Sequence, residues 1–208
     1  MSTFVQMQTN IANYLNRTDL TSEIKLAINR AIRTYSKTRF WFDEAVGTFV
    51  TVNGTQSYGS GTIPALIRNI DYVRLTVAST YYQLIERDIN YIISANVNNN
   101  TSQPTDYAWY AESIYLYPTP GQVYTVTVYY HKTYATMTAD ADTNSWTENP
   151  EAEEVIEKAS LSWLYENVVL DPDRAAQYKE AAKFAYRNLV SMNEQLTGMN
   201  GAIRATSW

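Results

Sequence analysis

The sequence predicts an α+β chain: a helical bundle formed by an N-terminal and a C-terminal helix pair, with an inserted antiparallel β domain, either a small sandwich or a single sheet. Apolar residues recur at three- and four-residue steps near both ends of the chain, which indicates amphipathic helices. Between them, short runs rich in Val, Ile and Tyr alternate with Gly, Asn, Pro and Ser, which is typical of strands and turns. Because the flanking helices must meet to bury their apolar stripes, the β region is predicted to be an insertion into the helical part.

The change from one periodicity to the other sets the predicted boundaries. A chain of 208 residues is long enough for one sizeable core, or for a compact domain with a second one inserted into it. We expect an N-terminal helix pair at 1–44, a β domain at 45–133, a linker at 134–148, a C-terminal helix pair at 149–197 and an extended tail at 198–208.

The first helix pair begins with a capping signal. Thr3 and Gln6 have the spacing of a capping box, in which each side chain bonds the backbone of the other residue. The polar stretch 16–19 then breaks the first helix, and either Asp19 or Thr21 can cap the second. Two such amphipathic helices are predicted to pack as an αα-hairpin.

Two turns organise the predicted β domain. Asn53 and Gly54 form the strongest short-range hairpin signal, because a type I′ turn needs positive φ at both central positions. The stretch 118–121, Pro-Thr-Pro-Gly, is predicted to join a second hairpin. Its even-numbered residues are expected to fill the β core and its odd-numbered tyrosines to lie on the opposite face: Ile114, Leu116, Val126 and Val128 in the core, Tyr115, Tyr117 and Tyr129 outside. The stretch 87–96 is predicted to form one short helix.

Helix signals return after a stretch of low apolar content at 135–146, which is interpreted as a linker. Asn149 is a good N-cap and Pro150 a good first helical residue, and Asp171 with Pro172 repeats the arrangement for the last helix. Gly198 is expected to end that helix. The tail that follows carries three large apolar residues, Met199, Ile203 and Trp208, and is interpreted either as a frayed terminus or as a segment that docks on a partner.

Composition excludes several classes of function. With 16 Lys+Arg, 21 Asp+Glu and no cluster of basic residues, the chain is not expected to read nucleic acid. The absence of cysteine excludes disulfides, zinc thiolate sites and cysteine nucleophiles, and indicates a reducing compartment. The N-terminus has no leader pattern and no window approaches the roughly 20 apolar residues of a membrane span, so a soluble, unprocessed chain is predicted.

The residues that could carry chemistry favour structural interpretations. His131 is the one histidine and lies in a predicted strand, where packing or hydrogen bonding is the commoner role. The stretch 140–144, Asp-Ala-Asp-Thr-Asn, resembles the start of a calcium loop with Glu151 at its twelfth position, but Ser145 stands where the loop needs glycine, which favours a polar linker. The run of glutamates from Glu151 to Glu157 could hold a general-acid pair, although a helix N-terminus explains it better. We therefore predict no enzyme, no metal and no cofactor.

Four stretches together resemble the head-to-tail connector, or portal adaptor, proteins of tailed bacteriophages. The stretches are 11–44, "IANYLNRTDLTSEIKLAINRAIRTYSKTRFWFDE"; 51–58, "TVNGTQSY"; 103–130, beginning "QPTDYAWYAESIYLYPTP"; and 152–192, beginning "AEEVIEKASLSWLYENVVLDPDR". The resemblance covers nearly all of residues 4–196 in order, and it lies in the succession of these elements.

The resemblance implies a non-enzymatic virion protein of the phage neck, assembled in the host cytoplasm. Such a protein forms a homo-oligomeric ring, typically twelvefold, that docks on the portal protein, extends the channel for passing DNA without binding it specifically, and attaches a tail nozzle or stopper protein, with no membrane involved. By this resemblance the portal-docking tail would use Met199, Ile203, Arg204 and Trp208.

Two surfaces are further expected to serve the assembly. Tyr115, Tyr117 and Tyr129 are candidates for a subunit or tail contact, since tyrosine is enriched at protein interfaces. Glu151, Glu154 and Glu157 are candidates for an acidic face toward the channel, where like charge would keep DNA from sticking.

Two other functions remain open at this stage. A tyrosine-rich carbohydrate-binding module of a phage tail would be favoured by exposed aromatic side chains on one flat sheet face. A cell-wall hydrolase would need catalytic acids, and nothing in the residue spacing supports one.

Overall fold

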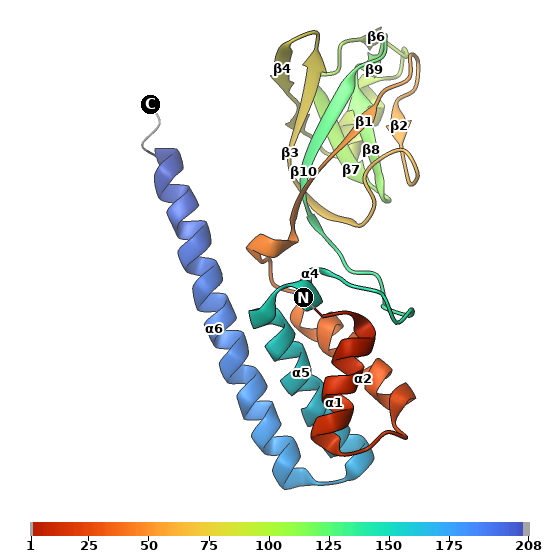
Figure 1. Cartoon of the computed structure of the whole chain (residues 1–208). Coiled ribbons are helices and arrows are strands. Elements are labelled where there is room, and N and C mark those ends of the chain that lie inside the picture. The colour runs from red at the N-terminus through yellow and green to blue at the C-terminus, as the bar shows by residue number, and fades with distance from the viewer. Residues whose placement is uncertain (1, 206–208) are drawn as a thin grey trace. The chain divides into compact units, whose positions relative to one another are not determined.

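The structure, a computed structural model, describes the backbone of residues 2–205 and the side chains of residues 2–197. The chain divides into two compact units (Figure 1). The helical unit consists of Met1–Asp43 and Tyr134–Trp208, and the β unit consists of Glu44–Thr133. The predicted α+β class is therefore confirmed.

The described residues form six α-helices, five of them in the helical unit. The sixth, α3, lies in the β unit and provides the short helix expected there. Their bounds, with those of one 3₁₀ turn and one π-helical turn, are α1 (Phe4–Leu15), α2 (Thr21–Tyr35), the 3₁₀ turn η1 (Trp41–Asp43), α3 (Ile89–Ala95), α4 (Ser145–Glu148), α5 (Pro150–Leu164), the π turn η2 (Tyr165–Val169) and α6 (Pro172–Ala205).

Local capping signals explain where several helices begin. The capping box at α1 is confirmed, because the Thr3 amide donates to Gln6 Oε1 at 2.8 Å and the Gln6 amide donates to Thr3 Oγ1 at 3.4 Å. Asn149 caps α5 by accepting a bond from the Ala152 amide at 3.0 Å. The expected cap of α2 is wrong: the N-cap is Leu20, without a side-chain bond, because Asp19 is held by Arg17 at 2.7 Å instead.

One apolar core holds the helical unit together. Residues from α1, α2, α4, α5 and α6 bury their side chains in it. Aromatic rings fill its centre, where Phe40 stacks on Phe42 with ring centroids 5.2 Å apart and Trp146 meets both rings edge-on. Burial of this apolar area is the main stabilising term of the unit.

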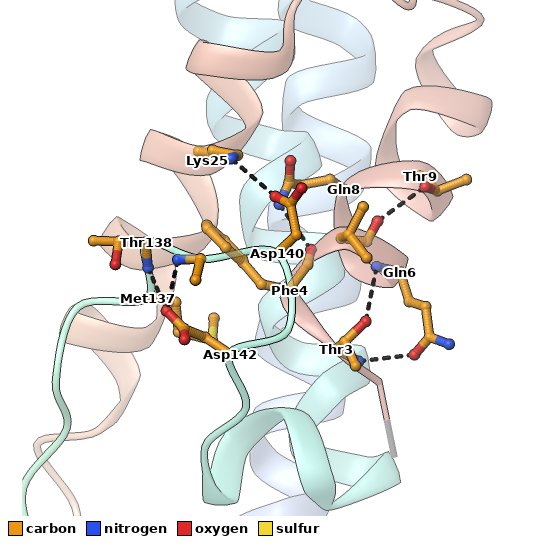
Figure 2. A network of polar contacts seen from close by, with 12 residues as sticks. Thr3, Phe4, Gln6, Gln8, Thr9, Lys25, Met137, Thr138, Asp140 and Asp142 are labelled. Atoms are coloured by element: carbon orange, nitrogen blue, oxygen red, sulfur yellow. Dashed lines mark hydrogen bonds and ion pairs between the residues drawn. The ribbon is translucent and has the colours of Figure 1, made fainter.

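The segment predicted as a linker is instead part of this core. Met137 is buried, and Trp146, on the short helix α4, is fully buried. Figure 2 shows the loop before α4 lying against the first turn of α1, where the Phe4 and Val5 amides donate to the carbonyls of Asp142 and Asp140. Two large apolar residues anchor the stretch although its average composition is polar.

Helix α6 also departs from expectation, because its backbone stays helical past Gly198 to Ala205. The sequence predicted that Gly198 would end the helix and that an extended tail would follow. Gly198 and Gly201 each cost about 1 kcal/mol relative to alanine inside a helix, and a cost of that size does not by itself end a helix.

The β unit contains two four-stranded sheets and one pair of two-residue strands. The first sheet has the order β1-β10-β3-β4 and the second the order β2-β8-β7-β5, while β6 pairs with β9. The strands are β1 (Glu44–Val50), β2 (Ser57–Tyr58), β3 (Ile67–Val77), β4 (Thr80–Gln83), β5 (Ile85–Glu86), β6 (Thr101–Ser102), β7 (Asp106–Tyr110), β8 (Ser113–Tyr117), β9 (Thr119–Pro120) and β10 (Thr125–Lys132).

The strand pairing is mixed, not purely antiparallel as predicted. The pairs β5–β7 and β6–β9 are parallel, and the other pairs are antiparallel. The chain passes from β4 in the first sheet to β5 in the second through one buried residue, Leu84. Strand β5 therefore continues the path of β4 into the other sheet without a turn. Turn residues, on which the antiparallel prediction depended, could not reveal the direction in which β5 pairs.

Both predicted hairpins are wrong, although the predicted core residues are right. Strands β8 and β10 belong to different sheets, so 118–124 is a crossover between them. Asn53–Gly54 joins β1 of the first sheet to β2 of the second, and there only Gly54 has positive φ, at 76°. The four predicted core residues are fully buried between the sheets: Ile114, Leu116, Val126 and Val128.

Candidate functional site

The predicted tyrosine face is divided between two sheets. Ile114 and Leu116 fill the core from β8, so Tyr115 and Tyr117 point to the outer side of the second sheet. Helix α3 packs there, and its Tyr91 ring lies 6.1 Å from the ring of Tyr117, edge-on. Both tyrosines are half-buried within the unit itself.

Tyr129 lies on the outer side of the first sheet, where it belongs to a cluster of tyrosines around Arg74 that the sequence did not predict. Its ring is 5.6 Å from that of Tyr72 on β3. The Arg74 guanidinium lies 4.3 Å from the centroid of Tyr81 and 5.6 Å from that of Tyr129, a double cation–π arrangement. The sequence pattern that could have indicated this cluster is the alternation of Tyr72 and Arg74, which places both side chains on one face of β3.

This cluster gives little support to a sugar-binding platform. Of the three tyrosines in it, Tyr81 alone is largely exposed, at 62%. Arg74 already lies over that ring. A stacked sugar needs an open aromatic face, so the carbohydrate hypothesis gains no observation here.

His131 occupies a structural environment in β10. Its side chain is buried, and Nε2 lies 3.0 Å from Oδ2 of Asp71 on β3. This geometry fits the interpretation of His131 as a packing and hydrogen-bonding residue of the strand.

The carboxylates of the calcium-like stretch are engaged by the protein. Asp142 accepts bonds from the Thr138 amide at 2.6 Å and the Ala139 amide at 2.8 Å, and these bonds lower the pKa of Asp142 (Figure 2). Asp140 pairs with Lys25 of α2 at 3.1 Å. Within the described part of the chain, no group of three or more His, Asp and Glu side chains could hold a metal ion.

The acidic residues of α5 lie along its N-terminal half, from Glu151 in the first turn to Glu157 at the middle of the helix. Glu151 and Glu154 are exposed, whereas Glu157 is partly buried and accepts a bond from Lys158 at 3.0 Å. Burial, the largest single effect, lowers the pKa of Lys158, but the bond and charge of Glu157 together with Tyr14 and Glu154 outweigh it, so the pKa is raised. Glu151 and Glu154 therefore form the more solvated part of the predicted acidic face.

A groove of about 360 Å³ lies between α2 and α6, and part of α5 lines it. Small side chains line much of it, and charged side chains border it; the lining residues are Ala27, Arg30, Ala31, Thr34, Tyr35, Ala159, Ser162, Trp163, Glu166, Lys179 and Ala182. The Arg30 guanidinium is 5.6 Å from the Trp163 ring. On α6, Lys179, Lys183 and Arg187 follow one another at four-residue steps and lower the pKa of Glu180, Lys183 most of all.

The predicted docking tail falls largely outside what the structure describes. The backbone of Met199, Ile203 and Arg204 belongs to α6. Their side chains, and the whole of Trp208, lie outside the described residues.

The described residues offer surfaces that are suited to protein contacts. They present a partly buried cluster of tyrosines, a groove partly lined by small residues and one long helix, which are features typical of proteins that act through contacts with other proteins. The chain belongs to the SU10 adaptor protein family, whose model matches residues 2–205. A comparison with curated proteins found no match to the chain.

Family membership supports a bacteriophage structural adaptor and a virion component, in agreement with the resemblance seen in the sequence. No described helix combines the length and the apolar character needed to cross a bilayer.

Proposed function

We propose that this protein is a head-to-tail adaptor: a non-enzymatic ring, twelvefold, that docks on the phage portal protein, extends the DNA channel and attaches a tail nozzle or stopper protein. The family match over residues 2–205 is the observation that carries this proposal. In the assembled ring the shared core of α1, α2, α5 and α6 acts as a helical bundle, and the protein occupies the virion neck after assembly in the host cytoplasm.

Charge supports the proposed channel. The net charge of −5 makes the chain a poor ligand for DNA phosphates, so DNA can slide past without being held. We assign Glu151, Glu154 and Glu157 to the channel side, with the exposed Glu151 and Glu154 closest to the DNA. Tyr115, Tyr117 and Tyr129 are assigned to contacts with a neighbouring subunit or with the tail.

The C-terminal end of α6 is proposed to dock on the portal through Met199, Ile203, Arg204 and Trp208. The test compares the full chain with a chain ending at Gly198, each mixed with the portal protein of the same phage. Negative-stain images should show rings on the portal for the full chain, and the shortened chain should bind the portal at least about tenfold more weakly, because buried aromatic and aliphatic anchors dominate most interfaces. Unchanged binding by the shortened chain would remove the tail assignment, and failure of the full chain to form rings with the portal would remove the ring assignment.

A further inference from the structure

The first sheet of the β unit has two open edges. Strand β1 is first and β4 is last in its strand order, so each pairs on one side only (Figure 1). The Thr51 amide bonds the Tyr124 carbonyl at 2.8 Å, and the Leu84 amide bonds the Val73 carbonyl at 2.9 Å. Successive residues of a strand turn their main-chain groups to alternate sides. The residues that turn theirs to the open sides are therefore Glu44, Val46, Thr48 and Val50 in β1 and Tyr81 and Gln83 in β4.

Neither edge carries the usual protection against pairing with another chain. Natural sheets guard an open edge with lysine, proline or a bulge. Strands β1 and β4 contain no lysine, arginine or proline, and their registers with β10 and β3 run without a shift. Among the described residues, no hydrogen-bond partner is found for the main-chain groups on the two open sides. Such an edge is completed by an extended segment that supplies main-chain groups of its own.

The opposite edge of the same sheet supplies a segment with the right direction. Neighbouring strands in the order β1-β10-β3-β4 are all antiparallel, so β1 and β4 run in opposite directions. Strand β4 of one copy, placed beside β1 of the next copy, therefore continues the antiparallel pattern. Because each copy then uses a different edge on each side, the contact is head-to-tail and can close into a ring.

Charge complementarity supports a second copy as the occupant. Arg74 lies opposite Gln83 of β4, with its guanidinium 4.3 Å from the centroid of Tyr81 on the same edge strand. Its Nε atom is buried without a hydrogen-bond partner, and no described carboxylate pairs with it. Glu44 is exposed on the outer face of β1, beside Val46, and also has no ion pair among the described residues. Each edge thus offers the charge that the other edge lacks.

We propose that β4 of one copy pairs antiparallel with β1 of the next copy, with Tyr81 opposite Val46 and Gln83 opposite Glu44. The proposal rests on the ring function proposed above and names a subunit contact within it. In this register the Cα atoms of Glu44 and Arg74 are two strand spacings apart, about 10 Å, which the two side chains together can span. Val46 meets the Tyr81 ring in an aromatic–β-branched pair, which stabilises antiparallel strands. A shift by two residues moves Glu44 away from Arg74, so charge fixes the register.

Disulfide formation tests the contact, because the chain has no cysteine and introduced thiols are the only ones present in it. Val46→Cys and Tyr81→Cys are combined in one chain, which is mixed with the portal protein, mildly oxidised and resolved on a non-reducing denaturing gel. Within one chain these positions lie on opposite edges of a four-stranded sheet, about 14 Å apart, which is too far for a disulfide. The contact should therefore give a ladder of dimers, trimers and higher species, whereas each single variant can give at most dimers.

The matched control pairs Tyr81→Cys with Val50→Cys. Val50 is exposed on the same face of β1, about 13 Å along the strand from Val46. The control should give no ladder. A ladder of equal intensity in the control, or no ladder in the test chain, would overturn the contact.

Exchange of the two charges provides a second measurement. Glu44→Lys brings two cations together at the contact and Arg74→Glu two anions, so each variant alone should form rings on the portal at least about tenfold less efficiently. Mixed in equal amounts, the two variants should recover ring formation, because every contact in an alternating ring then joins a cation to an anion. Glu112→Lys, at an exposed position between β7 and β8, is the control and should leave ring formation unchanged.

Mixing also guards against a folding defect, which a second defective chain would not repair. Circular dichroism of each variant should match that of the unaltered chain. Unimpaired rings from Glu44→Lys alone, or no recovery in the mixture of two folded variants, would contradict the ion pair.

The outcomes separate this inference from the ring function. If the unaltered chain forms rings on the portal and the Val46–Tyr81 cysteine pair gives no ladder, the edge contact is wrong and the ring stands. If a ladder forms without rings, the edge contact stands and the ring is wrong. If neither forms, both proposals are wrong.

Discussion

The Asp142 carboxylate shows how one residue organises a loop. It accepts two backbone amide bonds, from Thr138 and Ala139, and these bonds stabilise its charged form. The pKa of Asp142 is lowered mainly by the Thr138 amide and next by the Ala139 amide. The carbonyls of Asp140 and Asp142 in turn accept the first amides of α1, so the carboxylate indirectly positions the start of that helix.

Replacing Asp142 by Asn should lower the melting temperature at pH 7 and change its pH dependence. A folded-state pKa below the unfolded value contributes stability that is present above the unfolded pKa, near 4, and is lost as the pH falls through the folded pKa. The difference in melting temperature between the two chains should therefore shrink as the pH falls from 7 to 3, followed by circular dichroism.

The matched control is Asp173→Asn, an exposed aspartate in the first turn of α6. It should change the melting temperature much less at pH 7. A melting-temperature difference for Asp142→Asn that stays constant from pH 7 to pH 3 would contradict the role given to the charge.

Two residue-scale predictions succeeded because the partner is close in sequence. The capping box of Thr3 and the cap by Asn149 each join residues three positions apart, so spacing alone could reveal them. The bond from Lys25 to Asp140 joins residues 115 positions apart. No local pattern specifies that bond, so from the sequence the carboxylates of 140–144 could only be interpreted as part of a polar linker that resembles the start of a calcium loop.

At the scale of elements, the structure differs most from the sequence prediction at the short helix α4, which lies in a stretch predicted to be a linker. Trp146 is fully buried and meets Phe40 edge-on with ring centroids 5.3 Å apart. Averaged over 135–146, polarity favoured a linker, but one tryptophan can bury more apolar area than several small residues. Packing, not composition, therefore decides the role of this stretch.

We expect Trp146→Ala to reduce the free energy of unfolding by about 3–5 kcal/mol, because it leaves a large cavity in an aromatic core. Chemical denaturation followed by circular dichroism measures the change. A flexible linker would give a change within about 0.5 kcal/mol, which is typical of surface substitutions.

Trp146→Phe is the matched variant for this prediction. The Trp146 Nε1 atom is buried without a hydrogen-bond partner among the described residues, so phenylalanine loses ring volume but no polar contact. Its cost should be clearly smaller than that of alanine. Equal costs for the two variants would mean that packing of the ring is not what holds α4.

The β elements separate what a pattern can predict from what it cannot. Alternation identified the buried residues of β8 and β10 because it depends only on which face of a strand meets the core. Which strands pair depends on contacts between residues far apart in the sequence, and alternation does not record these contacts. The turn residues at 118–121 are compatible with a crossover between sheets as well as with a hairpin. The candidate tyrosines consequently fell on two sheets, and the cluster around Arg74 was missed because its rings come from three strands.

At the scale of the whole molecule, the β unit is an insertion whose two ends lie side by side. Glu44, its first residue, pairs in register with His131 near its last. Within the helical unit, the residues that flank the insertion also meet, because the Tyr134 hydroxyl donates to the Asp43 carboxylate. Each unit has its own apolar core. Loss of one core therefore need not disturb the other.

We therefore expect the helical unit to fold without the insertion. In the test chain, Glu44–Thr133 is replaced by a flexible glycine-serine linker of about four residues joining Asp43 to Tyr134. Closing so short a loop costs little entropy, because its ends already meet in the native structure. The shortened chain should keep its helical circular dichroism and unfold cooperatively in denaturant, with Trp146→Ala still strongly destabilising. A non-cooperative transition, or insensitivity to Trp146→Ala, would show instead that the core of the helical unit forms only when the β unit is present.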